Sequence, residues 1–169
     1  NNNGSLVKDI LDDGGGTSII TDNDINSEKG IAITAITGGP DGEWQFSTDD
    51  GGTWTAISVT SGEGLLLQSD DDTRVRFVPQ TGFDNSNTAG AIEFRAWDRT
   101  DGSNNGDKVT LPSDLGGTSA FSNTEASTTI TVVTNAPPTV DSPIGNRGVV
   151  KGSSVSINVS SNFDDDDID

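Results

Sequence analysis

The feature that most constrains the fold is a series of short segments rich in β-branched and aromatic residues, separated by clusters of Gly, Asp, Asn and Ser. Such segments indicate strands joined by turns, and helical periodicity is almost absent. We expect seven strands and a weaker first one at residues 6–11; the seven lie at residues 30–37, 43–47, 53–57, 64–68, 73–78, 91–97 and 127–134. Their number and spacing predict an all-β, two-sheet sandwich with Greek-key connections.

Apolar and polar residues alternate most clearly in the fifth and sixth of these segments. Alternation is typical of strands with one face in a core, so we expect these side chains to point inward: Val75, Phe77, Ile92, Phe94 and Ala96. Three of the intervening residues are arginines, and with Arg99 they form the only concentration of positive charge in the sequence: Arg74, Arg76, Arg95 and Arg99. We expect these arginines on adjacent strands, in exposed ion pairs with Glu93 and nearby Asp residues; a ligand that carries a carboxylate is the alternative.

Two adjacent prolines, Pro137 and Pro138, mark a domain boundary because they enforce an extended backbone after the last predicted strand. We therefore expect a sandwich over residues 1–134, a linker over 135–138 and the beginning of a second sandwich over 139–169. The last region offers two candidate strands, residues 148–150 and 153–160, and is too short to bury a core alone. It belongs to a longer tandem array or packs on a neighbouring copy. The first residues include neither an initiator Met nor a signal sequence, so we expect a piece of a larger protein.

The composition points to a bound metal ion and argues against some classes of partner. The chain of 169 residues has 27 acidic and 9 basic residues, a formal net charge of −18, and no His, Cys or Met. Such charge opposes compaction unless cations screen or bind it, and an inventory of oxygen ligands points to Ca²⁺ rather than Zn, Cu or Fe. Scattered Lys and Arg argue against nucleic acid or an anionic membrane as a partner, and no stretch is long enough for membrane insertion.

Four segments, in order, resemble a known family. Asp22-Asn23-Asp24 precedes Gly-Ile-Ala-Ile-Thr, Phe77-Val78-Pro79 precedes Gly82-Phe83-Asp84, Phe94 to Asp98 form a strand ending in Asp, and Ile130 to Pro137 form a strand and linker. Together they resemble the cadherin-like, VCBS-type repeats of giant bacterial surface adhesins, often those with RTX secretion signals. The resemblance covers most of residues 17–140 and implies an Ig-like or cadherin-like sandwich. The chain departs from the family pattern where its linker lacks an Asp beside Asn135.

The resemblance implies that Asp22, Asp24 and Asp98, with Asp101 nearby, meet at one end of the sandwich and coordinate Ca²⁺. Residues 22 and 24 lie on one side of an extended segment, so both carboxylates can reach one ion. Further candidate ligands are Asn135 in the linker and Asp164 and Asp166 in the acidic run that would lead into the next repeat. The alternatives are ordinary turn aspartates that bond local amides and, for the run, a solvated charge cluster.

Residues 47–54, Ser-Thr-Asp-Asp-Gly-Gly-Thr-Trp, fit the Asp-box pattern S-x-D-x-G-x-T-W. One copy predicts one hairpin whose Asp bonds turn amides and whose Trp packs over the turn; a propeller would need several copies. We expect Trp44, Trp54 and Trp97 to pack rather than to form a sugar platform. Without His, a Cys nucleophile or a phosphate loop, the chain is not expected to be an enzyme.

These observations predict a secreted, calcium-binding extender module of a large bacterial adhesin that acts in cell-surface or biofilm adhesion, with neighbouring repeats of the same chain as partners. A glycan- or peptide-binding module of the same adhesin is the alternative, because the stretch from Asp101 to Phe121 is long for a hairpin loop and long loops often bind ligands. A third possibility is an accessory domain of a secreted polysaccharide-degrading enzyme.

Overall fold

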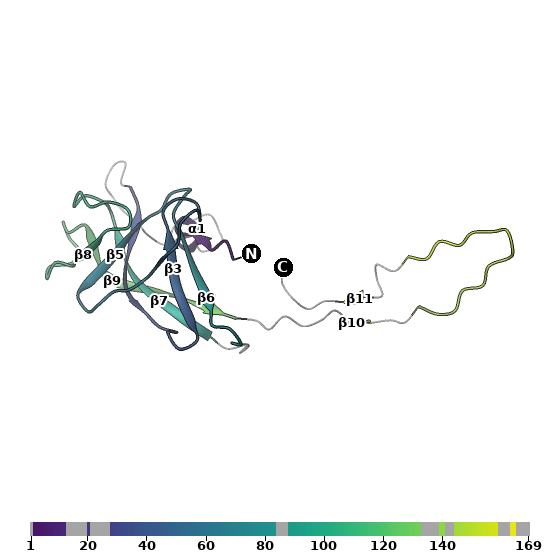
Figure 1. Ribbon diagram of the computed structural model, residues 1–169. Helices are drawn as coiled ribbons and strands as arrows, with labels where there is room; N and C mark the ends of the chain where they lie inside the picture. The colour runs from purple at the N-terminus through teal and green to yellow at the C-terminus, as the bar shows by residue number, and fades with distance from the viewer. Residues whose placement is uncertain are drawn as a thin grey trace. The chain divides into compact units, whose positions relative to one another are not determined.

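The computed structural model describes residues 2–12, 20, 28–83, 88–132, 139–140, 144–158 and 163–164. Contacts within the chain divide it into two units, Asn1–Val132 and Val133–Asp169 (Figure 1). The first unit contains nearly all of the regular secondary structure, and the second contains two short strands.

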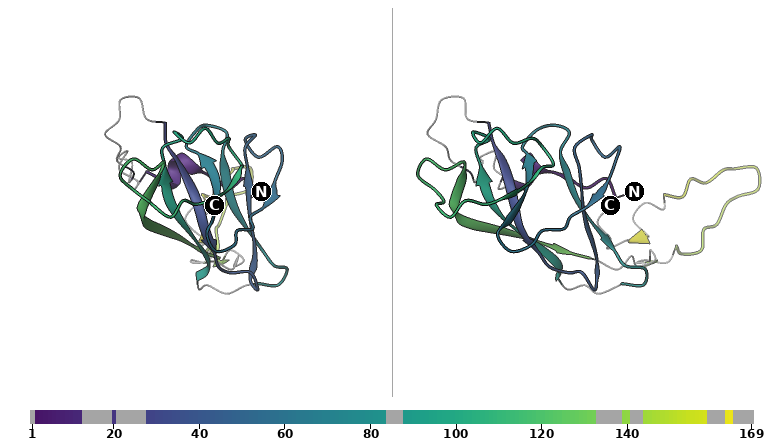
Figure 2. Two further views of the ribbon diagram at one scale, coloured as in Figure 1. Left: turned by 90° about the vertical axis from the view of Figure 1, so that its left-hand side faces the viewer. Right: turned by 60° about the vertical axis from the view of Figure 1, so that its left-hand side comes forward.

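The first unit consists of two antiparallel sheets that pack face to face. The four-stranded sheet has the order β1-β6-β3-β4, formed by Ser5–Leu6, Arg74–Pro79, Gly42–Ser47 and Thr55–Ala56. The five-stranded sheet has the order β8-β5-β2-β7-β9, formed by Lys108–Thr110, Glu63–Gln68, Gly30–Ile36, Thr88–Trp97 and Phe121–Thr131. The predicted all-β sandwich is confirmed, and two layers of strands are visible in Figure 2.

The core between the sheets is built from alternate residues of facing strands. Ile31 and Ile33 of β2 pair with Leu67 and Leu65 of β5, and all four side chains are fully buried. From the other sheet, Trp44 meets Phe77 edge to face, with ring centroids 5.2 Å apart. The same cluster includes Val75, Ile92 and Phe94, as their alternation predicts. This core joins the two sheets into one unit.

A second hydrophobic cluster covers the outer face of the five-stranded sheet. Its buried members are Ala32, Leu66, Trp97 and Phe121, and residues of the segment 98–121 pack on them. Leu66 lies between Leu65 and Leu67, and all three are 0% exposed, so β5 is covered on both faces. Backbone hydrogen bonds attach the covering segment: the Leu66 N–H donates to the Asp107 carbonyl (2.9 Å), and the Gly106 N–H donates to the Leu66 carbonyl (2.7 Å).

Several strand predictions need correction. Residues 6–11 form a strand only up to Leu6, because Val7–Ile10 close a single helical turn, α1, in which the Leu11 N–H donates to the Val7 carbonyl. Strand β4 has only two residues, β8 was not predicted, and β9 begins at Phe121 rather than at residue 127. Ala96, the penultimate residue of β7, is only half-buried, although it pairs with the buried Ile31 of β2.

The arginines predicted on adjacent strands lie in different sheets. Arg74 and Arg76 are on β6, and Arg95 is on β7. Each makes its own contacts: Arg74 pairs with Asp50 and Arg95 with Glu125 across the β7–β9 pair, whereas Arg76 lies over the Trp54 ring. Two strands that follow one another in the sequence need not pair in one sheet. The prediction that these arginines lie on adjacent strands was therefore wrong.

In the second unit, β10 (Thr139–Val140) pairs antiparallel with β11 (Phe163–Asp164). Residues 144–158 contain a turn in which the Ser153 N–H donates to the Val150 carbonyl, 2.9 Å away. The strands predicted at residues 148–150 and 153–160 do not form among the described residues, 144–158. Their alternating pattern is present, but no described strand provides the hydrogen-bonding neighbour that a strand requires.

Candidate metal site at the acidic turn after β7

Strand β7 ends in a tight turn, residues 98–103, that contains the described candidate ligands Asp98 and Asp101. The Asp98 Oδ1 accepts hydrogen bonds from the Thr100 N–H (2.9 Å) and the Thr100 hydroxyl (2.7 Å). Arg99 takes a φ of 65° and Gly102 a φ of 76°, so both residues have left-handed backbone conformations within this turn. The Asp98 N–H donates to the Ala120 carbonyl, which ties the turn to the segment leading into β9.

Asp101 uses both carboxylate oxygens within the protein. Its Oδ1 accepts a hydrogen bond from the Trp97 indole N–H (2.9 Å), and its Oδ2 accepts one from the Ser103 hydroxyl (2.7 Å). Partial burial favours the neutral acid, but the hydrogen bonds from Ser103 and Trp97 outweigh it and lower the pKa of Asp101. Asp101 is therefore a charged acceptor that orients the buried Trp97 ring, and a metal ion would have to compete with these donors.

The chain leading into β2 lies beside this turn. Gly30 pairs with Trp97, and the Glu28 carboxylate forms an ion pair with the Arg99 guanidinium, with 2.5 Å between Oε2 and Nη1. Arg99 also lies over the Trp97 ring at 6.0 Å from its centroid. Residues 28–30 and 97–99 thus meet at one end of the sandwich. In the sequence, Ile20 lies two residues before Asp22 and Glu28 four residues after Asp24, and the Lys29 Nζ donates to the Ile20 carbonyl at 3.1 Å.

The other predicted ligands can be placed only in part. Asp22, Asp24, Asn135 and Asp166 lie outside the described residues. The backbone of Asp164 is on β11, paired with Thr139 in the second unit. Among the residues that the structure describes, no group of three or more acidic side chains is close enough to hold a metal ion. The calcium site remains a prediction that depends on residues beyond the described ranges.

The Asp-box residues form the turn that follows β3. The Asp49 Oδ1 accepts from the Ser47 hydroxyl (2.7 Å) and from the Thr53 N–H (2.7 Å), and the Gly51 N–H donates to Ser47 Oγ (2.9 Å). The hydrogen bonds from Ser47 and Thr53 lower the pKa of Asp49. Asp50 and Gly51 have positive φ angles of 54° and 85°. The predicted hairpin with a local structural role for Asp49 is confirmed.

The three tryptophans pack within the protein. Trp44 is 6% exposed and its indole N–H donates to the Thr37 carbonyl (3.0 Å), while Trp97 is 1% exposed. Trp54 is half-buried, and the Arg76 guanidinium carbon lies 3.9 Å from its ring centroid. A ring whose face is covered by a guanidinium or by core residues cannot stack on a sugar, so the packing prediction is confirmed for Trp44 and Trp97.

Sequence reasoning missed the role of the segment 98–121. Under the alternative function, the stretch from Asp101 to Phe121 was expected as a long loop that binds a ligand, whereas residues 108–121 contain β8 and side chains that pack on Leu66 and Trp97. The available signal was the run Leu65-Leu66-Leu67, because three consecutive apolar residues in a strand place leucine on both faces of the sheet. Another segment must then cover the second face.

Comparisons with known proteins add no assignment: no family model, no curated protein and no solved structure matches this chain. Within the described part of the chain, no helix has the length and apolar character of a membrane span. The proposals below therefore rest on the residues and on the geometry described above.

Proposed function

We propose that this chain is a calcium-binding structural module of a large, secreted bacterial surface adhesin, in which bound Ca²⁺ stiffens one end of the sandwich. The observation that carries the proposal is the meeting of residues 28–30 with the turn that contains Asp98. Asp22 and Asp24 are only a few residues before Glu28 in the sequence. The chain between them and Glu28 is long enough for their carboxylates to reach the Asp98 carboxylate.

The available coordination chemistry supports calcium over other metals. Asp98 has one oxygen, Oδ2, without a hydrogen bond to any described residue, whereas its Oδ1 is held by Thr100. A carboxylate fixed through one oxygen can offer the other to a cation at little cost in side-chain entropy. Calcium would also reduce the repulsion within a chain whose formal charge is −18.

The role in this proposal is mechanical rather than catalytic. The resemblance to tandem adhesin repeats places each module between neighbours of the same kind, with a linker that the proline pair extends. Calcium in such extracellular modules binds with a Kd on the order of 10⁻⁴ to 10⁻³ M. The fold would then be fully stiffened only outside the cell, where calcium is abundant.

Thermal unfolding of the full chain with and without Ca²⁺ tests this function. At about 10 mM Ca²⁺ and a Kd of about 10⁻⁴ M, binding to the folded state alone adds about 2.7 kcal/mol to the free energy of unfolding. The midpoint should then rise by roughly 5 to 10 °C, and Asp98→Asn should remove most of this rise. Asp9→Asn is the matched control, because Asp9 is exposed on α1 and should leave the calcium effect intact.

Equal concentrations of Mg²⁺ distinguish a site from general charge screening. Magnesium requires six oxygens at short distances and keeps its water, so it should raise the midpoint far less than calcium. The proposed function is wrong if Ca²⁺ leaves the melting midpoint unchanged. It is also wrong if Mg²⁺ raises the midpoint as much as Ca²⁺ does and the Asp98→Asn variant still shows the full rise in Ca²⁺.

A further inference from the structure

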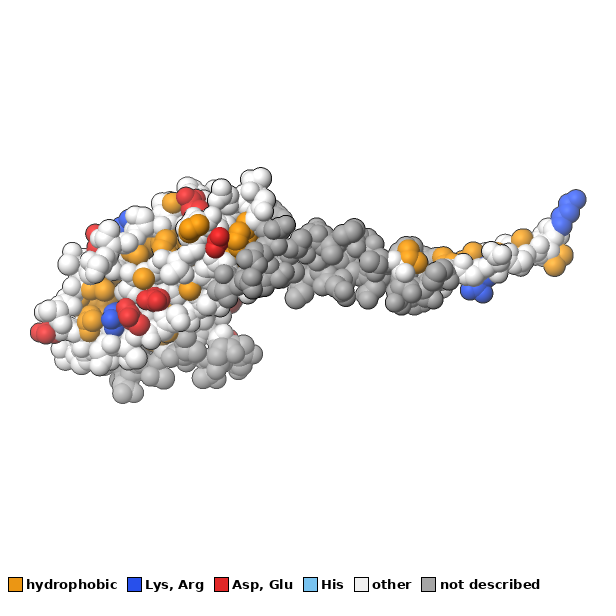
Figure 3. All heavy atoms as spheres, turned by 90° about the horizontal axis from the view of Figure 1, so that it is seen from below, with side chains coloured by type: hydrophobic (Ala, Val, Ile, Leu, Met, Phe, Trp, Pro, Cys, Tyr) orange, Lys and Arg blue, Asp and Glu red, His pale blue; other side chains and the backbone are white. Residues whose placement is uncertain are grey.

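The second unit contains a segment whose surface differs from the rest of the described chain. We name residues 144–158 the basic arm, because it contains Arg147 and Lys151 and neither Asp nor Glu. Both cations are exposed, and neither forms an ion pair with a described residue. On the face shown in Figure 3, blue and hydrophobic side chains follow one another along the arm without a red one.

The basic arm also exposes apolar side chains. Every large hydrophobic residue that is exposed among the described residues belongs to the second unit, and five of the six lie on the arm: Ile144, Val149, Val150, Val155 and Ile157, with exposures from 43% to 77%. Exposed apolar side chains in a row mark interaction sites. Val155 and Ile157 alternate with serine, a strand pattern for which no described strand provides a partner.

A groove on the sandwich has the complementary character. It has a volume of about 530 Å³ and lies on the outer face of the five-stranded sheet, between β2, β7, β9 and the segment after β8. Three glutamates line it, Glu63, Glu93 and Glu125, against one arginine, Arg95. Its apolar wall includes Leu111 and Leu115. The groove can therefore receive a segment that combines positive charge with aliphatic side chains.

The polar groups of the groove are not all satisfied. Arg95 pairs with Glu125 at 3.2 Å, but its Nε is buried and has no hydrogen-bond partner. Glu93 is exposed and its carboxylate makes no ion pair with a described residue. A cation of a docked segment could pair with the exposed Glu93 carboxylate.

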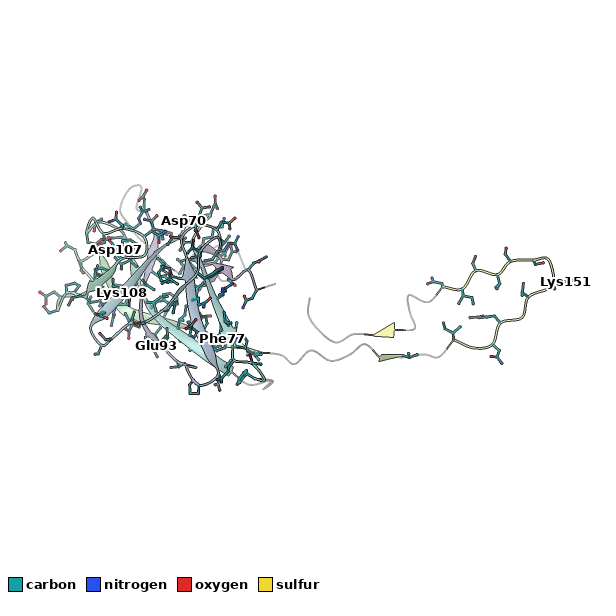
Figure 4. The ribbon with its side chains drawn as sticks, in the orientation of Figure 1. Asp70, Phe77, Glu93, Asp107, Lys108 and Lys151 are labelled. Carbon is teal, nitrogen blue, oxygen red and sulfur yellow. The ribbon has the colours of Figure 1, made fainter. Side chains whose placement is uncertain are left out.

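From these features we infer that the basic arm of one copy docks in the glutamate-lined groove of a second copy. Figure 4 labels the two charged residues that would lead this contact, Lys151 at the turn of the arm and Glu93 on the sheet. The contact is attractive although each copy is strongly negative, because the arm presents two exposed cations, without an ion pair to any described residue, next to exposed apolar side chains. It joins two different surfaces, so it is a heterologous contact that builds either a closed ring or an open chain of copies.

Analytical ultracentrifugation of the full chain tests the inference, in EDTA so that the outcome is independent of calcium. In about 50 mM salt, the weight-average sedimentation coefficient should rise with concentration from about 5 to 500 µM, and added salt should suppress the rise. The arm variant Arg147→Glu/Lys151→Glu and the groove variant Glu63→Lys/Glu93→Lys should each weaken association at least about tenfold.

Mixing the two variants provides the decisive measurement. An acidic arm fits a basic groove, and the basic arm of the groove variant fits the acidic groove of the arm variant, so the mixture should associate although neither variant does alone. The control variant Asp9→Lys/Glu43→Lys makes the same change in net charge as the groove variant, on exposed residues away from the groove, and should retain association. Circular dichroism melts check that each variant is folded.

Three results would overturn the inference. The first is a wild-type chain that stays monomeric over the whole concentration range. The second is an arm variant that associates like the wild type. The third is a mixture of folded variants that fails to associate. A calcium-dependent melting midpoint in any of these cases would leave the proposed function intact, because the two experiments use different residues.

Discussion

Replacing Leu66 with Ala tests whether the outer face of the five-stranded sheet is a true core. Leu66 is 0% exposed and contacts the cluster of Ala32, Trp97 and Phe121. The substitution removes three carbons, a transfer cost of about 2.4 kcal/mol at about 0.8 kcal/mol each, and leaves a cavity that raises the total to roughly 3 kcal/mol. If the face were open to solvent, the cost would be well below about 1 kcal/mol.

Thermal unfolding followed by tryptophan fluorescence measures this cost, because Trp97 lies in the same cluster. A loss of roughly 3 kcal/mol should lower the melting midpoint by about 10 °C in a unit of this size. Val150→Ala is the control, since Val150 is 77% exposed, and should shift the midpoint by no more than about 2 °C. A shift of that small size for Leu66→Ala would refute the account of the covering segment.

Three further predictions concern turns and close contacts. Asp101→Ala should lower the melting midpoint at pH 7. The pKa of Asp101 is lower in the folded state, so the ionised carboxylate contributes its full stability above the ordinary Asp pKa of 3.8. The difference in midpoint from the wild type should vanish as the pH falls through the folded-state pKa. Gly42→Ala should destabilise by about 1 to 3 kcal/mol in urea unfolding, because a Cβ there would lie 2.4 Å from the Val78 carbonyl oxygen, whereas Gly39→Ala meets nothing within 4 Å and should be nearly neutral. Asp49→Ala should speed proteolytic cleavage in the turn after β3, since the Thr53 N–H loses its acceptor; an unchanged rate would contradict the hydrogen-bonding role of Asp49.

Much of the sandwich could be predicted from local patterns. The alternation of Val75 with Phe77 and of Ile92 with Phe94 identifies core-facing residues, because a pleated strand places every second side chain on one face. The assignment of strands to sheets could not be predicted in this way. The pairing of β6 with β3 and of β7 with β2 joins residues far apart in the sequence, and alternation carries no information about which strands become neighbours.

At the candidate site, too, some features could be predicted from the sequence and others could not. The Asx-type turn at Asp98 follows from an acidic residue at the end of a strand, and the structure contains it. The alternation that places Phe94 on the inner face also places Trp97 on the outer face, but the contact of Asp101 with the Trp97 indole depends on the turn that follows β7 and could not be foreseen. Asp22 and Asp24 lie outside the described residues, so their approach to Asp98 remains a prediction.

The unequal lengths of the terminal strands have a consequence for how the first unit bears load. Tension on its C-terminal end acts along β9, in which eight of the eleven residues pair with β7, and hydrogen bonds perpendicular to the strand resist sliding together. Tension on its N-terminal end acts on β1, where only Ser5 and Leu6 pair with β6. We expect the unit to yield first at its N-terminal end, and pulling from each end in a force spectrometer would measure the difference.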